Sequence, residues 1–162
     1  MKISGIDPKS LCNEVLLVLP RVEQPIVFKA RGLKNYDEFD ALCPPPKPPG
    51  KQTRDGWVPN EKDSTYQTVM GEWSKKRLAY IVVNSLSDVE WDTVELGNPA
   101  TWTNWETDLL SSNLSQVEVN RVLGLVLEAN ALDEAKLQKA RESFIVGQLP
   151  MLPESSGLPV AQ

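Results

Sequence analysis

The chain has 162 residues, of which 41% are hydrophobic and 24% are charged, a balance typical of globular proteins rather than disordered ones. It contains no histidine and only two cysteines, so it lacks the commonest general base and most sets of metal ligands or thiol nucleophiles. The net charge of −5 argues against a nucleic-acid-binding protein, because proteins that neutralise phosphates concentrate lysine and arginine.

Cysteine placement and the N-terminal region bear on the cellular compartment. Cys12 and Cys43 lie in unrelated segments and form no CxxC pair, which favours reduced thiols over a disulfide. The apolar run at residues 15–19 is too short to span a bilayer, and Asp7 and Glu14 precede it where a signal peptide carries positive charge. We therefore expect a soluble intracellular protein that does not associate with a membrane.

The first predicted elements are two strands at residues 14–19 and 25–31, which are short, rich in Val, Ile and Phe, and bounded by prolines. In the second strand Ile26, Phe28 and Ala30 alternate with charged residues, a pattern typical of a strand with one wet face. Two strands alone are marginally stable in water, so the hairpin must lie on helices or pair with the edge of another chain.

A short helix is predicted at residues 36–42, and a proline-rich segment follows it. Prolines remove backbone donors and favour extended backbone, so residues 44–62 are predicted to be a linker or surface arm. PxxP spacing within residues 44–49 is compatible with docking into an aromatic groove, although a stiff spacer is the commoner role. Trp57 stands alone in this polar segment and is either a tether onto its own domain or an anchor for a partner.

The next helix is predicted from Asp63 or Ser64 to Ser85. Residues 78–83 are apolar on all sides, which makes this helix the expected centre of the core. Asn98 is then predicted to cap a helix with Pro99 at its first position. Its Trp102 and Trp105 fall on one face, which favours core packing over a stacking platform for sugars or bases.

Two further helices complete the predicted domain. Ser115 and Glu118 have the spacing of a capping box at the start of one of them. Asp133 opens the last helix and Gly147 is predicted to end it. Its apolar stripe contains Leu137, Ala140, Phe144 and Ile145.

Together these elements predict an α+β fold that is mainly α, in four parts. They are an N-terminal β-hairpin and short helix (1–43), a proline-rich arm (44–62), a helical domain of about four helices (63–147) and a flexible C-terminal tail (148–162). Three or four short helices and a hairpin leave at least one apolar edge that needs cover. The candidate partner-binding residues are Ile26, Phe28, Trp57, Phe144 and Ile145.

No catalytic, cofactor-binding or metal-ligating set is predicted. The Gly50-Lys51 pair fails the P-loop pattern, since Pro45 and Gln52 stand where that loop needs Gly and Ser or Thr. Two acidic groups could supply paired carboxylates or hold a hard metal, but solvated faces are the favoured interpretation. These groups are Asp37, Glu38 and Asp40, and Glu90, Asp92 and Glu95.

Five sequence segments follow one another along the chain: IVFKARGL, YDEFDALCPPPKPP, EWSKKRLAYIVVNSL, EWDTVELGNPATWTNWETDLL and NALDEAKLQKARESFIVG. With these segments the chain resembles the tail assembly chaperones of long-tailed bacteriophages, from about residue 15 to residue 147. The resemblance implies a non-enzymatic, helical protein of the host cell cytoplasm that coats the tape measure protein, keeps it soluble and recruits tail tube subunits. Many proteins of that family are made in a short and an extended form by programmed frameshifting, and if that holds here, this chain is the short form.

Two other functions stay open at this point. One is a structural, tail-associated protein that remains in the virion, and the other is an acidic inhibitor of a host protein. Self-association is compatible with all of these functions.

Overall fold

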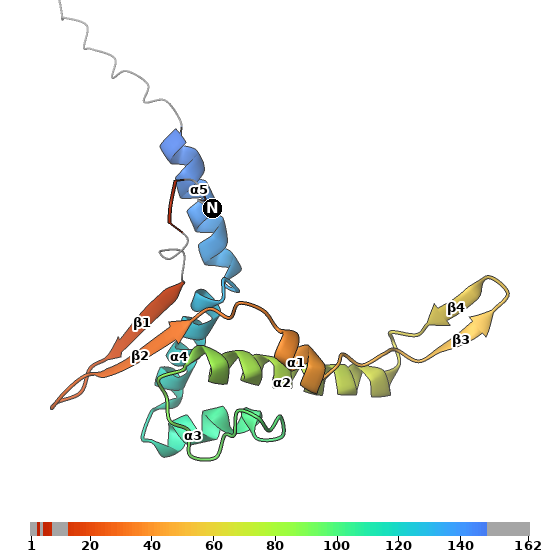
Figure 1. The fold of residues 1–162 in the computed structure, drawn as a ribbon, viewed down its shortest axis with the longest axis horizontal. Helices are drawn as coiled ribbons and strands as arrows, with labels where there is room; N and C mark the ends of the chain where they lie inside the picture. Colours follow the sequence, from red (N-terminus) through yellow and green to blue (C-terminus); the bar gives the residue numbers. More distant parts are fainter. Residues whose placement is uncertain (1–2, 4, 8–12, 149–162) are drawn as a thin grey trace, which may run out of the picture. The chain divides into compact units, whose positions relative to one another are not determined.

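The computed structural model describes residues 3, 5–7 and 13–148, which form an α+β fold in which helices dominate, as the sequence predicts (Figure 1). The chain divides into two compact units, Met1–Leu132 and Asp133–Gln162. This division differs from the predicted one, which assigned the last helix to the same domain as the earlier helices. The reason is that the last helix has only exposed side chains among those described, so none of them joins the core.

The predicted N-terminal hairpin is present as strands β1 (Glu14–Leu19) and β2 (Ile26–Arg31), which pair antiparallel with Leu17 opposite Phe28. One face of this sheet packs on helix α4 (Gln116–Ala129). The side chains of that inner face are Val15, Leu17, Leu19, Ile26, Phe28 and Ala30.

Helix α1 (Asp37–Leu42) matches the predicted short helix and supplies Phe39, which is completely buried. The ring of Phe39 lies 5.5 Å from that of Trp73 and 5.4 Å from that of Tyr80, measured between centroids. The Nε1 of Trp73 donates a hydrogen bond to the Cys43 carbonyl at 2.8 Å. This bond holds the start of the proline-rich segment against the helix that carries Trp73.

The proline-rich segment contains a second antiparallel hairpin, formed by β3 (Gly50–Thr53) and β4 (Gly56–Pro59), where the sequence predicts only an extended linker or arm. Two features overcome the prolines. Pro49 and Pro59 stand at or beyond strand ends, where a missing donor costs little. Gly56 adopts a φ of +118° after the turn, and the Thr53 hydroxyl donates to its carbonyl at 2.8 Å.

Helix α2 (Ser64–Ser85) begins as predicted, because the Asp63 carboxylate accepts a hydrogen bond from the Tyr66 amide at 2.8 Å. Its second half, around Ala79–Val83, is buried on all sides and forms the centre of the core, as predicted.

The predicted helix start at Asn98 is wrong. Residues 98–101 form turns in which the Asn98 side chain accepts from the Ala100 amide. A 3-10 turn, η2 (Trp102–Asn104), then leads into α3 (Trp105–Ser111). The later start buries Trp102 completely and lets its Nε1 donate to the Leu96 carbonyl at 2.9 Å.

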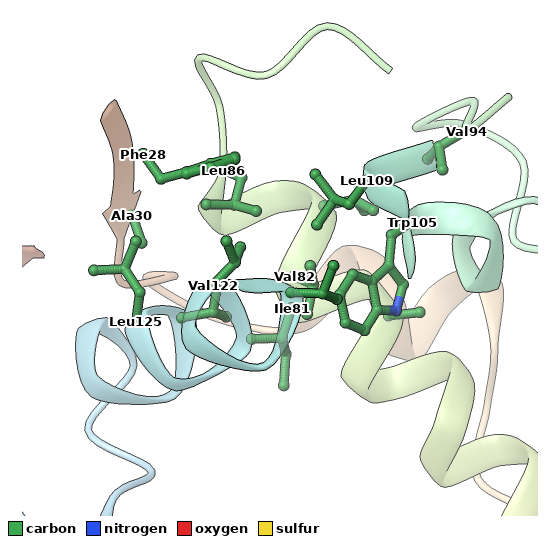
Figure 2. Close-up of a cluster of buried hydrophobic side chains, with 14 of the residues drawn as sticks. Phe28, Ala30, Ile81, Val82, Leu86, Val94, Trp105, Leu109, Val122 and Leu125 are labelled. Atoms are coloured by element: carbon green, nitrogen blue, oxygen red, sulfur yellow. The ribbon is translucent and has the colours of Figure 1, made fainter. Parts of the chain in front are cut away.

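Figure 2 shows the core as one cluster of side chains drawn from β2, α2, α3 and α4. Helix α4 opens with the predicted capping box, in which the Ser115 hydroxyl accepts from the Glu118 amide and the Glu118 carboxylate accepts from the Ser115 amide. Val119, Val122 and Val126 of α4 face the core.

The second unit contains α5 (Glu134–Gln148), whose start matches the prediction because the Asp133 carboxylate accepts from the Lys136 amide at 3.2 Å. The predicted stop at Gly147 is wrong, since that glycine lies within the helix. The remainder of the predicted tail, from residue 149, lies outside the described residues. No helix in the described part of the chain combines the length and apolarity needed to cross a membrane.

Candidate functional site

The β1–β2 hairpin was predicted to meet a partner through Ile26 and Phe28, but Phe28 is only 7% exposed and Ile26 is half-buried. Both side chains belong to the inner face of the sheet that packs on α4. The prediction for Phe28 is therefore wrong. In a strand the side chains alternate between faces, so burying Phe28 on α4 turns Val27 and Lys29 outward.

The outer face of the hairpin carries Leu16, Val18 and Val27, which are 57%, 57% and 55% exposed. Val18 and Val27 are directly opposite in the strand register, and Leu16 follows on the same face of β1. We call these three side chains the outer apolar face. The alternation in the sequence contained the signal for it, because the charged Lys29 and Arg31 already mark the wet side of β2.

Charged groups at the border of the outer apolar face are paired within the molecule. Arg31 bonds to the Glu14 carboxylate at 2.8 Å, and the Lys29 ammonium lies 3.6 Å from the Asp88 carboxylate. Because each of these charges already has a counter-ion in the same molecule, a partner can cover the apolar side chains without leaving an unpaired charge at the border. An apolar surface bordered by paired charges favours protein contact over binding of a charged small molecule.

Two asparagines hold the hairpin against the C-terminal end of α4. The last carbonyls of a helix lack partners within it. The Asn13 amide supplies them, donating to the Ala129 carbonyl at 2.6 Å and the Glu128 carbonyl at 3.2 Å. Asn130 accepts from the Leu33 amide at 2.9 Å and donates to the Ser85 hydroxyl at 2.8 Å. The hairpin is thus fixed to both α4 and α2.

The first turn of α4 is tied to the tip of the hairpin by an ion pair between Arg21 and Glu118, whose atoms lie 2.7 Å apart. The hydrogen bond from Arg21, together with one from the Ser115 amide, lowers the pKa of Glu118 to about 2. Glu118 therefore combines a capping role with a long-range link. The spacing of Ser115 and Glu118 predicted the cap, but nothing in the sequence predicted the ion pair with Arg21.

Phe144 and Ile145, predicted to contact a partner, are 66% and 51% exposed on α5. Leu137 and Val146 of the same helix are also exposed. A helix of 15 residues is marginally stable in water unless one face is covered. The described part of α5 thus carries an exposed apolar stripe, and the partner-binding role of Phe144 and Ile145 stays a prediction.

Trp57 lies on the β3–β4 hairpin and is 59% exposed. Its indole crosses Gly50 of the neighbouring strand, so closely that a β-carbon at Gly50 would lie 2.8 Å from the ring. Trp57 does not belong to the core. The structure therefore shows contact within the hairpin and leaves more than half of the surface of Trp57 exposed.

The proline-rich segment forms shallow surface pockets with the exposed first half of α2. One, of about 340 Å³, lies between Pro46 and Tyr66, and another, of about 260 Å³, lies between Pro44 and Trp73. The segment thus lies along the helix and is not a free spacer.

Arg77 of α2 is held between aromatic rings, with its guanidinium carbon 4.8 Å from the Tyr36 centroid and 5.7 Å from that of Trp73. Its Nε is buried without a hydrogen-bond partner among the described residues. Cation–π contact with the two rings accounts for the position of this side chain and links the start of α1 to α2.

Asp108 is a buried carboxylate that the sequence did not single out. It accepts hydrogen bonds from the Thr93 hydroxyl at 2.7 Å and from the amides of Thr93 and Asp92 at 2.9 and 3.1 Å. Burial raises the pKa of Asp108, but the hydrogen bonds from Thr93 and its neighbours outweigh burial and lower it. Asp108 thus fixes the loop before η2 onto α3.

The acidic groups singled out in the sequence do not form a metal centre in the part of the chain that the structure describes, where no three His, Cys, Asp or Glu side chains are placed to share an ion. Asp37, Asp40, Glu90, Asp92 and Glu95 are exposed to solvent. Glu38 accepts a long hydrogen bond of 3.4 Å from the Tyr80 hydroxyl. The features that stand out on the described surface are apolar and aromatic side chains suited to protein contact.

Models of protein families, curated proteins and solved structures were each compared with the chain, and none of them matches.

Proposed function

We propose that this chain is a non-enzymatic tail assembly chaperone of a long-tailed bacteriophage. In the host cell cytoplasm it binds the tape measure protein, keeps that protein soluble and helps to recruit tail tube subunits. The observation that carries the proposal is the outer apolar face of the β1–β2 hairpin, formed by Leu16, Val18 and Val27 and bordered by paired charges.

The chemistry of this face suits a client made of long apolar helices. Flat aliphatic side chains without unpaired charges contact many sequences without selecting one, which a holding chaperone requires. The stripe on α5, with Phe144 and Ile145, offers the same chemistry from the second unit. The net charge of −5 favours solubility of the complex.

The test is co-expression of the chain with the tape measure protein, followed by measurement of the soluble client and of affinity for a client fragment. The double variant Leu16→Thr, Val18→Thr keeps β-branched or β-compatible side chains while removing apolar surface. We expect it to weaken client binding roughly tenfold, equivalent to about 1.4 kcal/mol. The matched control is Val22→Thr, because Val22 is fully exposed in the same hairpin but lies outside the paired strands.

A client that is equally insoluble with and without the chain would contradict the proposal. If the double variant and the control bind the client equally well, the outer apolar face is not the surface that binds the client. Mass spectrometry of purified virions separates the chaperone from a structural tail protein, since a chaperone is expected to be absent or sub-stoichiometric there.

A further inference from the structure

The β3–β4 hairpin and the residues around it have the features of a docking arm. Its sheet has two strands, and no other strand among the described residues pairs with either outer edge. Trp57 and Val58 are exposed on it, at 59% and 50%. An isolated two-stranded hairpin is marginally stable in water, so a partner that covers Trp57 would stabilise this one. Figure 1 shows the hairpin continuing beyond the N-terminal end of α2.

The arm, residues 44–62, is basic although the chain as a whole is acidic. It contains four cations and two carboxylates, which gives it a net charge of +2, against −5 for the whole chain. All four cations are exposed, and none takes part in an ion pair within the described residues. They are Lys47, Lys51, Arg54 and Lys62.

Residues 78–120 have the opposite character, since they contain no lysine or arginine and seven carboxylates. Asp88 and Glu118 are paired with cations and Asp108 is buried. The other four are exposed and, in the described structure, have no cationic partner; we call them the acidic face. They are Glu90, Asp92, Glu95 and Glu106, and Leu96, which follows Glu95 in the sequence, is also exposed.

The cations of the arm lie away from the acidic face of their own molecule, because Lys47 and Lys51 line pockets with Asp63 at the start of α2. The arm precedes Asp63 at the start of α2, whereas η2 packs on Tyr80 in the second half of that helix, with 5.1 Å between the Tyr80 and Trp102 ring centroids. At about 1.5 Å per residue, Asp63 and Tyr80 are roughly 25 Å apart along the helix axis.

We propose that the arm of one molecule docks on the acidic face of a second copy of the chain. Exposed Trp57 supplies the apolar anchor, and Lys51 and Arg54 lie opposite carboxylates such as Glu90 and Asp92 of the second copy. The interface is heterologous, because different surfaces of the two copies meet, so each molecule can both give and receive an arm. Such contacts build rings or open chains.

The experiment measures the mass of the full chain in solution by light scattering and analytical ultracentrifugation at roughly 0.05 and 0.5 M salt. We expect the wild type to associate at low salt and to dissociate at high salt. The arm variant Lys51→Glu, Arg54→Glu and the face variant Glu90→Lys, Asp92→Lys should each raise the dissociation constant more than roughly tenfold. Trp57→Ala, which leaves the charges of the arm unchanged, should weaken the association seen at low salt.

Mixing the two charge-reversed variants provides the decisive measurement. The arm of each now complements the face of the other, so two proteins that do not associate alone should associate when mixed. The matched control for the arm variant is Lys75→Glu, Lys76→Glu, which makes the same change in net charge as the arm variant but on the exposed side of α2. Circular dichroism and thermal melts establish that each variant is folded.

Two results would overturn the proposal. One is a wild type that stays monomeric at low salt. The other is an oligomer whose mass is unchanged by reversal of the arm charges, which would assign self-association to the outer apolar face or to α5. Neither result bears on client binding through Leu16 and Val18, which the solubility assay measures separately.

Discussion

Asp108 illustrates how a single buried carboxylate can organise a loop. It accepts three hydrogen bonds from Asp92 and Thr93, so the charged form is the one that the fold stabilises. We expect Asp108→Asn to lower the free energy of unfolding by about 1–3 kcal/mol, because the new amide presents donors to the donors of Thr93. Urea denaturation measures this change, and Glu106→Gln, on an exposed site of the same helix, should leave stability almost unchanged.

The direction of the pH dependence follows from the lowered pKa of Asp108. A group whose folded-state pKa is lowered stabilises the fold above its unfolded pKa, and that stabilisation is lost as the pH falls through the folded value. The Asp108→Asn variant should therefore lose less stability on acidification than the wild type. Equal acid sensitivity of the two proteins would argue that Asp108 is protonated in the native state.

Asn130 is the second residue with a large expected effect. Replacing it with alanine leaves the Leu33 amide and the Ser85 hydroxyl without these partners in a partly buried position. We expect Asn130→Ala to destabilise the fold by roughly 2–4 kcal/mol. Asn120→Ala, on an exposed face of α4, is the control for the loss of an asparagine from this helix, and a comparable loss there would refute a specific role for Asn130.

What the sequence revealed about single residues depended on how local their interactions are. Ser115 and Glu118 are three residues apart, so their capping box was predictable from spacing. The bonds from Thr93 to Asp108 and from Leu33 to Asn130 join residues 15 and 97 positions apart, and no spacing rule identifies such pairs. Phe28 was placed on a strand correctly, and its alternation with Lys29 and Arg31 already indicated the inner face, which its assignment to a partner contact overlooked.

At the scale of elements, the ion pair between Arg21 and Glu118 links the hairpin tip to the start of α4. The pKa of Glu118 is about 2 in the fold, against about 4.3 in an unfolded chain. Its stabilising contribution is therefore complete above about pH 4.3 and declines as the pH falls towards 2.

We expect Arg21→Gln to raise the pKa of Glu118, although not to its unfolded value, because the bonds from Ser115 remain. Carboxyl chemical shifts in an NMR titration measure this value directly. An unchanged pKa in the variant would show that the cap, and not the ion pair, sets the acidity of Glu118.

Elements with strong periodicity or capping were the predictable ones. Helix α2 and helix α4 begin where Asp63 and Ser115 predict. The β3–β4 hairpin was missed because its strands have four residues each and are flanked by prolines, although Asp55-Gly56 is a recognised turn signal. The false helix start at Asn98 arose because an asparagine followed by proline favours an isolated turn as well as a helix cap.

At the scale of the molecule, the fold class was predictable and the division into units was not. Periodicity identifies an apolar stripe on α5 but does not say whether the rest of the chain has a surface to cover it. The core already closes with side chains from β2, α2, α3 and α4 (Figure 2). The candidate partner-binding residues were likewise predicted only in part. Trp57, Phe144 and Ile145 are exposed, as a partner contact requires, whereas Phe28 is buried in the core.

The bond from Asn13 to the carbonyl of Ala129 joins residues that are 116 positions apart. During synthesis, β1 and β2 leave the ribosome long before α4, the helix that covers their inner face. The end of β2 at Arg31 and the end of α4 at Ala129 are 98 residues apart, so at about 5–20 residues per second roughly 5 to 20 s separate the two events. Throughout that interval the inner face of the hairpin, including Phe28, is exposed in the nascent chain. For seconds during its own synthesis, this protein therefore has an exposed apolar surface that needs protection.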